Sequence, residues 1–308
     1  MQGTVSKSTG KVYDVIADDG ISYRCSIRGK IRLEGRSTTN PVAAGDRVTI
    51  EIENESDAII TAILPRKNYI IRKSVNLSKE AQVIAANLDQ AFLFVTVLRP
   101  QTTCGFIDRF LVTADAYDIP VKLIFSKADQ YNSEELNSLA EMQLIYESIG
   151  YQTERLSLED EVLLNHLRDM LKDKTTLISG HSATGKTSFI NAVVPGLDLR
   201  VGDISEASGK GQHTTTFAEM FPLADGGFIL DTPGIKGFGL VDIPKDELHH
   251  HFPEFFKLLS ACKYHNCLHI KEPSCAVRNA IDSGEIPLSR YESYLSMYHD
   301  QEDESVYR

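Results

Sequence analysis

The chain has 308 residues, a net charge of −11 and 42 % hydrophobic residues, which suits two or three domains with packed cores. The sequence has no apolar run of about 18 residues, and its N-terminus lacks the apolar segment of a signal peptide, so we expect a cytoplasmic protein with no membrane partner. The acidic balance argues against nucleic-acid binding over the whole surface, but it leaves room for a local basic face.

Residues 1–73 have the pattern of a small β domain. Short alternating runs, KVYDVIADDG, ISYRCSIRG, DRVTIEIE and DAIITAIL, are separated by turns rich in Gly, Asp and Asn, which predicts a small barrel of the OB type. This region contains twelve Lys and Arg residues against nine Asp and Glu residues, the reverse of the whole chain. Four of the basic residues surround a single Glu34: Arg28, Lys30, Arg32 and Arg36. They form either an RNA-binding face or a solvated strand edge.

Residues 74–245 alternate predicted strands and helices, which indicates an α/β nucleotide-binding domain. The expected parallel strands are 91–98, 121–126 and 175–179, and FIDRFLVTADAYD between the first two has helical spacing. Ser133 is expected to cap a helix that runs to Gly150. The stretch FAEMFPLADGGFILD predicts a hairpin that turns at Asp225-Gly226.

The stretch GHSATGKT at 180–187 follows a predicted strand and precedes a predicted helix, TSFINAVV. This is the context in which G-x-x-x-x-G-K-T binds phosphates: backbone N–H groups surround them, the lysine reaches the β and γ oxygens, and the threonine hydroxyl binds Mg²⁺. The expected phosphate-binding residues are Gly180, His181, Ser182, Ala183, Thr184, Gly185, Lys186, Thr187 and Ser188. Many such loops have Gly where this chain has Ala183, so a positive φ there would strain the backbone.

A second carboxylate is expected at the end of another strand, and DTPG at 231–234 provides it. Asp231 would hold Mg²⁺ or its water shell, and the Gly234 N–H would meet the γ-phosphate. Between the two motifs, KGQHTTTF at 210–217 is a candidate switch segment, in which Thr215 or Thr216 joins Mg²⁺. The alternative for this run is an ordinary loop rich in Ser and Thr.

The base-reading motif precedes the phosphate loop. SKAD, formed by Ser126, Lys127, Ala128 and Asp129, ends the predicted strand VKLIF. The Asp129 carboxylate would accept hydrogen bonds from guanine N1–H and N2–H₂, a donor pair that adenine lacks. The Lys127 stem would cover the base, and the loop near Ser157 could add a contact. An ordinary GTPase places its reader after DTPG, so this order predicts a circular permutation.

Residues 246–308 are predicted to form a helical domain with a structural metal site. The spacing C-x4-C-x-H-x5-C joins three thiols and an imidazole, which suits one tetrahedral Zn²⁺ per chain. The ligands would be Cys262, Cys267, His269 and Cys275. Buried cysteines beside a chance histidine are the alternative, and His265 is a substitute ligand. The run His249–His251 is expected on a helix surface, and Cys25 and Cys104 are expected to be small apolar fillers.

Together these motifs resemble the RsgA family, the circularly permuted, small-ribosomal-subunit-dependent GTPases of bacteria. The resemblance covers nearly the whole chain and includes PVAAGDRV, AANLDQ, FIDRF, the phosphate loop, the H-T-T-T run, DTPGIKGFGL, HFPEF and the cysteine cluster. It implies an OB domain, a permuted GTPase domain and a zinc domain. It also implies a role in late maturation of the small ribosomal subunit, with rRNA as a partner and GTP hydrolysis stimulated by the ribosome.

Two departures from the family pattern touch nucleotide binding. Ser126 replaces the usual Asn, which loses an amide, and Ala183 and Thr184 are unusual in a loop that usually reads G-x-S-G-V-G-K-S. No Gln follows DTPG, so we expect His213 to orient the attacking water, as its family counterpart is suspected to do, with Lys186 and Gly234 neutralising charge on the phosphates. The alternative for His213 is a loop histidine without a catalytic part.

The function expected from the sequence is therefore hydrolysis of GTP to GDP and phosphate by a monomer that requires Mg²⁺. One alternative is an rRNA-binding assembly protein with a degenerate, poorly hydrolysing nucleotide site. Another is an ATP-using enzyme such as a small kinase, against which Asp129 argues.

Overall fold

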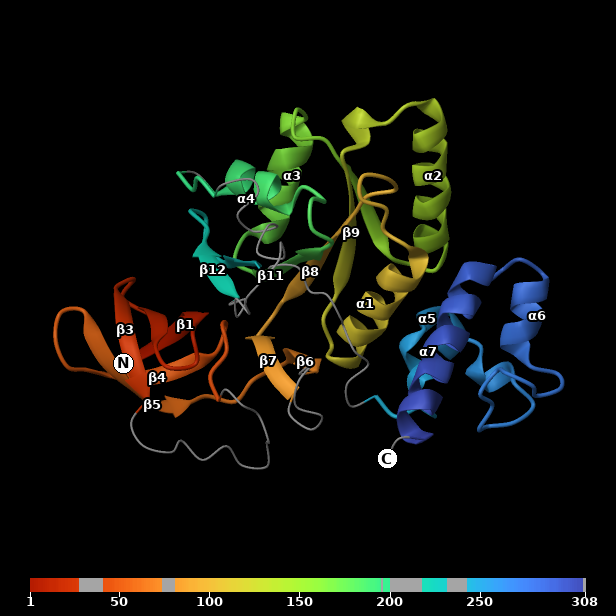
Figure 1. The fold of residues 1–308 in the computed structure, drawn as a ribbon, viewed down its shortest axis with the longest axis horizontal. Helices are drawn as coiled ribbons and strands as arrows, with labels where there is room; N and C mark the ends of the chain where they lie inside the picture. Colours follow the sequence, from red (N-terminus) through yellow and green to blue (C-terminus); the bar gives the residue numbers. More distant parts are fainter. Residues whose placement is uncertain (28–40, 74–80, 195, 200–217, 232–242, 307–308) are drawn as a thin grey trace.

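The computed structural model describes residues 1–27, 41–73, 81–194, 196–199, 218–231 and 243–306. A small barrel lies at one end of the molecule and a group of short helices at the other, with a sheet covered by helices between them (Figure 1). Within the described residues, no helix combines the length and the apolar character needed to span a bilayer.

Five strands form the barrel, and their burial alternates along each strand. They are β1 (Gln2–Ser8), β2 (Tyr13–Ala17), β3 (Ser22–Ile27), β4 (Arg47–Ile52) and β5 (Asp57–Ile63). Neighbours pair in the order β1-β2-β3-β5-β4, and β4 pairs with β1 to close the ring. The inward-facing side chains, Tyr13, Val15 and Cys25 among them, make one apolar core. The predicted OB-type barrel is confirmed, and Cys25 lies in its core as expected.

A hairpin leads from the barrel to the main sheet. It consists of β6 (Tyr69–Lys73) and β7 (Ala81–Ala86), whose pairing straddles the boundary expected after residue 73. The barrel approaches it so closely that a Cβ on Gly45 would lie 2.1 Å from the Ala86 carbonyl oxygen. Beside this contact, the Arg66 guanidinium binds the fully buried Asp46 carboxylate through two hydrogen bonds of 2.5 and 2.6 Å. The barrel is therefore anchored to the hairpin by close backbone packing, and to the segment that leads into the hairpin by a buried ion pair.

The main sheet has five parallel strands and one antiparallel strand, β12, which also pairs with β1 of the barrel at Glu219 and Lys7. They are β8 (Gln90–Val95), β9 (Val121–Ser126), β10 (Gln152–Leu156), β11 (Thr175–Gly180), β12 (Glu219–Pro222) and β13 (Phe228–Asp231). Their order is β10-β9-β8-β11-β13-β12. The strand that precedes the phosphate loop, β11, thus lies at the centre, between a strand from earlier in the chain and one from later. This is the permuted arrangement that the motif order predicts.

Helices cover both faces of this sheet, as a doubly wound fold requires. They are α1 (Cys104–Ala116), α2 (Ser133–Ser148), α3 (Glu161–Leu171) and α4 (Lys186–Val193). One core joins α1 and α2 to side chains such as Leu93 and Leu177. The other joins α3 and α4 to side chains such as Phe94 and Ile178. The predicted α/β nucleotide-binding fold is confirmed.

Two local predictions have different outcomes. The hairpin of β12 and β13 turns through Asp225 and Gly226 as expected. The cap of α2 is Asn132 rather than Ser133, because the Asn132 side chain accepts hydrogen bonds from the backbone N–H groups of Glu134 and Glu135. Glu135 completes a capping box, because its carboxylate accepts a hydrogen bond from the Asn132 N–H. This pairing puts the cap at Asn132, one residue before the predicted Ser133.

The C-terminal region consists of four short helical segments and the longer helix α7, and it packs against α1. They are η2 (Leu248–His251), α5 (Pro253–Phe256), η3 (Leu259–Ala261), α6 (Ala276–Asp282) and α7 (Leu288–Val306). Val112 of α1 belongs to their apolar core, together with Phe252, Phe255 and Tyr294. Helix α1 therefore serves two cores, one with the sheet and one with the C-terminal helices, and Figure 1 shows it between them.

Candidate functional site

The predicted base-reading residues lie at the carboxyl end of β9. Ser126 is buried, and Lys127 follows it in the left-handed region with a φ of 62°. Ala128 and Asp129 then begin the short η1 (Ala128–Gln130), where the Asp129 side chain is exposed. The Lys127 ammonium donates a hydrogen bond of 2.9 Å to the Arg99 carbonyl oxygen, on the loop that follows β8. An exposed carboxylate beside an anchored lysine stem suits the edge of a planar base.

The phosphate loop joins β11 to α4 in a wound backbone. Gly180 approaches β8 so closely that a Cβ there would lie 2.5 Å from the Phe94 carbonyl oxygen, and its φ is +138°. Ala183 has a φ of 65°, so the strain anticipated from the sequence is present at an exposed position. Gly185 also has a positive φ, and it immediately precedes α4. Three positive φ values within six residues give the loop the tightly wound backbone that is typical of phosphate-binding loops.

Lys186 is folded back onto its own loop. Its side chain is buried, and its ammonium group donates to the carbonyl oxygens of Gly180, at 2.9 Å, and of His181. Burial lowers the pKa of Lys186 to about 8, and the negative charge of Asp231 opposes that change. Phosphate oxygens would offer this ammonium a stronger partner than two neutral carbonyls.

The loop is also attached to its surroundings at two points. The Ser126 hydroxyl donates to the Thr184 carbonyl oxygen at 2.5 Å. The His181 ring stacks on Phe106 of α1, with centroids 3.9 Å apart and an angle of 31° between the planes. The structure thus brings the predicted base reader and the predicted phosphate loop into direct contact.

The candidate magnesium ligands are only partly covered by the described residues. Asp231 ends β13 next to β11, where it is buried opposite Ile178. Thr187 lies in the first turn of α4 and is half-buried, as are Ser182 and Ser188. The other predicted residues of the hydrolytic site, His213, Thr215, Thr216 and Gly234, lie outside the described residues, and so do the basic residues Arg28, Lys30, Arg32 and Arg36.

A second cluster gathers the predicted metal ligands in the C-terminal region. One potential ligand atom from each of Cys262, Cys267, His269 and Cys275 lies within 4.8 Å of all the others. The His269 Nδ1 atom is 3.3 Å from the Cys275 sulfur and 3.7 Å from the Cys262 sulfur. A tetrahedral zinc site, with bonds of about 2.3 Å to sulfur and 2.0 Å to nitrogen, places its ligand atoms at about this spacing. The cluster could hold a metal ion, and the substitute ligand His265 is exposed and outside it.

The loop around the cluster is held by hydrogen bonds that involve its backbone. The Glu272 carboxylate accepts from the N–H groups of Leu268, Ile270 and Lys271 at 2.8–2.9 Å. The hydroxyl of Tyr291 donates to the His269 carbonyl oxygen. Burial raises the pKa of Cys267 to about 12 and lowers the pKa of His269 to about 4. A bound cation would oppose the effect of burial on Cys267, because it favours the thiolate over the thiol.

The histidine run beside this cluster differs from its prediction. His249 was expected on a helix surface, but it is 5 % exposed, and its ring centroid lies 5.1 Å from that of His269. The short η2 turns it inward, whereas His250 is exposed. Cys104, predicted as a filler, is only half-buried at the start of α1.

One buried charged network was missed by the sequence analysis. The Arg290 side chain of α7 is fully buried, and it binds Glu254 of α5 at 2.7 Å and Asp108 of α1 at 2.6 Å. The Tyr146 hydroxyl of α2 donates to the same Asp108 oxygen at 2.9 Å. The network therefore joins the helices of the nucleotide-binding domain to those beside the metal cluster. A sequence signal exists, because Asp108 and Glu254 interrupt the apolar stretches FIDRF and HFPEF.

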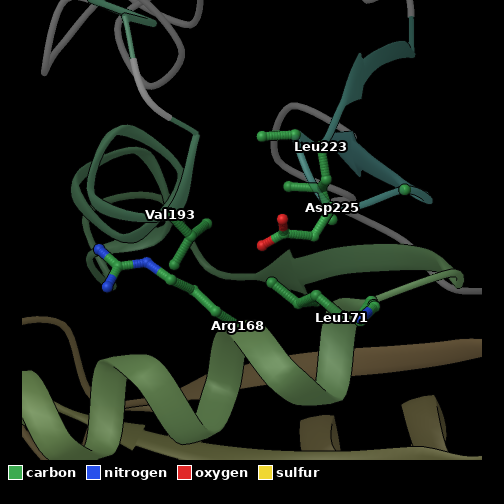
Figure 2. Close-up of a pocket in the computed structure, with 8 residues that line it drawn as sticks. Arg168, Leu171, Val193, Leu223 and Asp225 are labelled. Carbon is green, nitrogen blue, oxygen red and sulfur yellow. The ribbon is translucent and has the colours of Figure 1, made fainter.

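A small pocket lies at the other end of the sheet, near the amino ends of β11 and β13. It is lined by residues from α3, α4 and the β12–β13 turn, and the Asp225 side chain points into it (Figure 2). Its volume of ≈ 70 Å³ is far below the roughly 300 Å³ of small-molecule sites. The phosphate loop is therefore the better candidate for nucleotide binding.

Comparisons with known proteins agree with this geometry. Family models match residues 2–60, as an RsgA N-terminal domain, and residues 63–241, as an RsgA GTPase. The chain is 50 % identical over 306 residues to the small ribosomal subunit biogenesis GTPase RsgA of Christiangramia forsetii, covering 98 % of this chain and 97 % of that protein. It is 51 % identical over 303 residues to the protein of that name from Bacteroides fragilis, with 98 % of each covered.

Two solved structures are similar over nearly the whole chain. The crystal structure of YjeQ from Thermotoga maritima superposes with a TM-score of 0.77 at 31 % identity, covering 97 % of both chains. That of YloQ, described as a circularly permuted GTPase, superposes with a TM-score of 0.73 at 27 % identity, covering 98 % of this chain and 95 % of the other.

Proposed function

This chain belongs to the RsgA GTPase family and is a GTP-hydrolysing enzyme, and from that premise we propose that it hydrolyses GTP to GDP and phosphate during late maturation of the small ribosomal subunit. The observation that carries the proposal is the contact between the base-reading segment and the phosphate loop, made by Ser126 and Thr184. It supports a site in which the Asp129 carboxylate and the phosphate loop bind one nucleotide.

The base is bound at the carboxyl end of β9. The exposed Asp129 carboxylate accepts from guanine N1–H and N2–H₂, and adenine cannot supply that pair of donors. The Lys127 stem, held by its bond to the Arg99 carbonyl oxygen, covers one face of the base. Ala128 and the loop near Ser157 complete the edge of the site.

The phosphates are bound by the loop from Gly180 to Ser188. Nucleotide binding moves the Lys186 ammonium from the carbonyl oxygens of Gly180 and His181 to the β and γ oxygens. Thr187, Asp231 and a switch threonine, Thr215 or Thr216, hold Mg²⁺. When bound, Mg²⁺ supplies positive charge that stabilises the charge developing on the phosphates.

Hydrolysis requires a water held in line with the γ-phosphate. We assign that orientation to His213 and a γ-phosphate contact to the Gly234 N–H, on the sequence motifs alone. The isolated protein should turn over slowly, because the switch segment that contains His213 is ordered by the ribosomal partner.

The C-terminal cluster holds a structural Zn²⁺. Three sulfur donors and one imidazole at tetrahedral spacing support zinc over harder cations such as Mg²⁺. With four protein ligands the site has no open position, so its role is to hold the C-terminal helices together.

The chain divides into an RNA-binding barrel at 1–73, a permuted GTPase domain at 74–245 and a zinc domain at 246–308. The barrel contacts rRNA through the basic cluster at residues 28–36, and the protein acts as a monomer in the cytoplasm. The names of the relatives, small ribosomal subunit biogenesis GTPases, support the ribosomal partner.

The proposal is tested by measuring phosphate release with GTP and with ATP, each with and without purified small ribosomal subunits. Slow turnover of GTP alone, raised many-fold by subunits, is the expected result. Equal turnover of ATP would contradict the base reader. Absence of stimulation would favour an rRNA-binding assembly protein with a degenerate nucleotide site.

A further inference from the structure

Ser126 connects two strands that are not neighbours. It ends β9, whereas the phosphate loop follows β11, and β8 lies between them. Its hydroxyl passes the end of β8 and donates to the Thr184 carbonyl oxygen at 2.5 Å. Ser126 is 2 % exposed and Thr184 is fully buried, so water does not compete for this bond.

The bond attaches the loop where its backbone is under strain. Thr184 lies between Ala183, with a φ of 65°, and Gly185, with a φ of 89°. The Thr184 hydroxyl bonds inward to the His181 carbonyl oxygen at 2.9 Å, while its own carbonyl oxygen accepts from Ser126. The residue between the two left-handed positions is thus fixed on both sides, which holds the strained loop in one conformation.

A count of donors then limits what Ser126 can do for the base. A serine hydroxyl has one hydrogen to donate, whereas the amide of Asn, the usual family residue here, has two. Guanine N7 is an acceptor and requires a donor. Because the only hydrogen of the Ser126 hydroxyl is given to Thr184, none remains for N7.

We propose that Ser126 is a positioning residue, which holds the phosphate loop in place and does not contact guanine N7. Selection of the base is then left to the Asp129 carboxylate, which accepts hydrogen bonds from guanine N1–H and N2–H₂. The inference rests on the proposed binding of GTP. It predicts that the serine hydroxyl and the N7 atom contribute independently to affinity. The replacement of the usual Asn by Ser126 thus removes one contact to the base and keeps the hydrogen bond to the phosphate loop.

The test combines a protein change with a ligand change. Dissociation constants are measured for GTP and for 7-deaza-GTP, in which a C–H replaces N7, with the wild-type protein and with Ser126→Ala. Loss of one buried hydrogen bond should weaken both nucleotides equally, by about two- to tenfold. Weakening of GTP alone would show that Ser126 reads N7 and would overturn the proposal, as would no weakening of either.

A gain-of-contact variant tests the donor count from the opposite direction. Ser126→Asn restores a second donor, so it should raise the preference for GTP over 7-deaza-GTP by about three- to tenfold above the wild-type value. An unchanged preference would contradict the count. Ser148→Ala is the matched control, because the Ser148 hydroxyl also donates to a carbonyl oxygen, that of Ile145, in α2 away from the site.

A measurement without nucleotide separates this inference from the proposed function. Amide hydrogen exchange of a peptide covering 180–187 should be faster in Ser126→Ala than in the wild type, and unchanged in Ser148→Ala. Unchanged exchange in Ser126→Ala would overturn the fastening role even if GTP binds. If the wild-type protein binds no GTP, the proposed function fails. Faster exchange in Ser126→Ala than in the wild type would still support the role of Ser126 in holding the loop.

Discussion

The phosphate loop and the cysteine–histidine cluster are both short and irregular in backbone, yet their polar groups are satisfied differently. In the loop, Lys186 and Thr184 both donate hydrogen bonds to the His181 carbonyl oxygen, so polar groups of the loop are satisfied within the loop itself. In the cluster, three thiols and an imidazole converge, and the buried His269 Nε2 has no hydrogen-bond partner among the described residues. The loop is therefore held by its own hydrogen bonds, whereas we expect the cluster to be held by the metal ion that we propose for it.

The largest difference between the two regions should come from metal removal. Chelation, or Cys275→Ser, should release one zinc equivalent per chain and destabilise the C-terminal helices by about 5 kcal/mol or more, because structural zinc binds with about 10–16 kcal/mol of apparent free energy. Elemental analysis and thermal unfolding provide the measurement. Cys104→Ser, a half-buried cysteine at the start of α1, should keep the metal. An unchanged unfolding temperature after chelation would contradict the expectation that a metal ion stabilises the cluster.

The next largest effect should come from the buried network of Arg290, Asp108 and Glu254, which joins the helices of the nucleotide-binding domain to the C-terminal helices. Arg290→Met leaves the buried Asp108 and Glu254 carboxylates without their cation, which should cost about 3–5 kcal/mol in urea unfolding. Burial already raises the pKa of Asp108, and losing Arg290 should raise it further. The folded variant then binds more protons than the unfolded chain, so its deficit should shrink as the pH falls. Arg278→Met, at an exposed position on α6, should change little.

A smaller effect concerns the protonation of Lys186. Its pKa of about 8 lies below that of a lysine in the unfolded chain, so the stability of the unliganded protein should rise with pH between about 8 and 10. Nucleotide requires the ammonium form, so GTP affinity should be constant below pH 8 and fall above it by at most about tenfold per pH unit. Calorimetry in two buffers should show proton uptake on binding at pH 9. Equal affinities at pH 7 and 9.5 would show that the loop does not lower this pKa.

The smallest effect should come from the strained position in the loop. Ala183→Gly removes a Cβ from a residue with a φ of 65° and should stabilise the unliganded protein by about 0.5–1 kcal/mol. Ala140→Gly in α2 makes the same substitution in a regular helix and should destabilise by about 1 kcal/mol. Thermal unfolding of both variants compares the signs, and a loss of stability in Ala183→Gly would mean that the loop stores no strain there.

The order of the motifs was enough to predict the permuted sheet, because each motif follows an apolar run that can only be a buried strand. The cluster was also predictable, since its four ligands fall within 14 residues and their spacing is local. His249 was not, because three consecutive histidines look alike until the direction of η2 decides which one is buried. The same limit applies to the Ser126–Thr184 bond, which joins residues 58 positions apart across an intervening strand.

The position of β11 also has a consequence for synthesis. Strand β8 pairs through Gln90 with Thr176 of β11, and β11 pairs through Thr176 with Ile229 of β13. On the translating ribosome, β9 with its base-reading residues emerges before β11. The edge of β8 that pairs with β11 therefore stays unpaired until β11 has been made. We expect that nascent chains that end before Asp231 bind no GTP. Incomplete chains would then not compete with the finished enzyme for nucleotide.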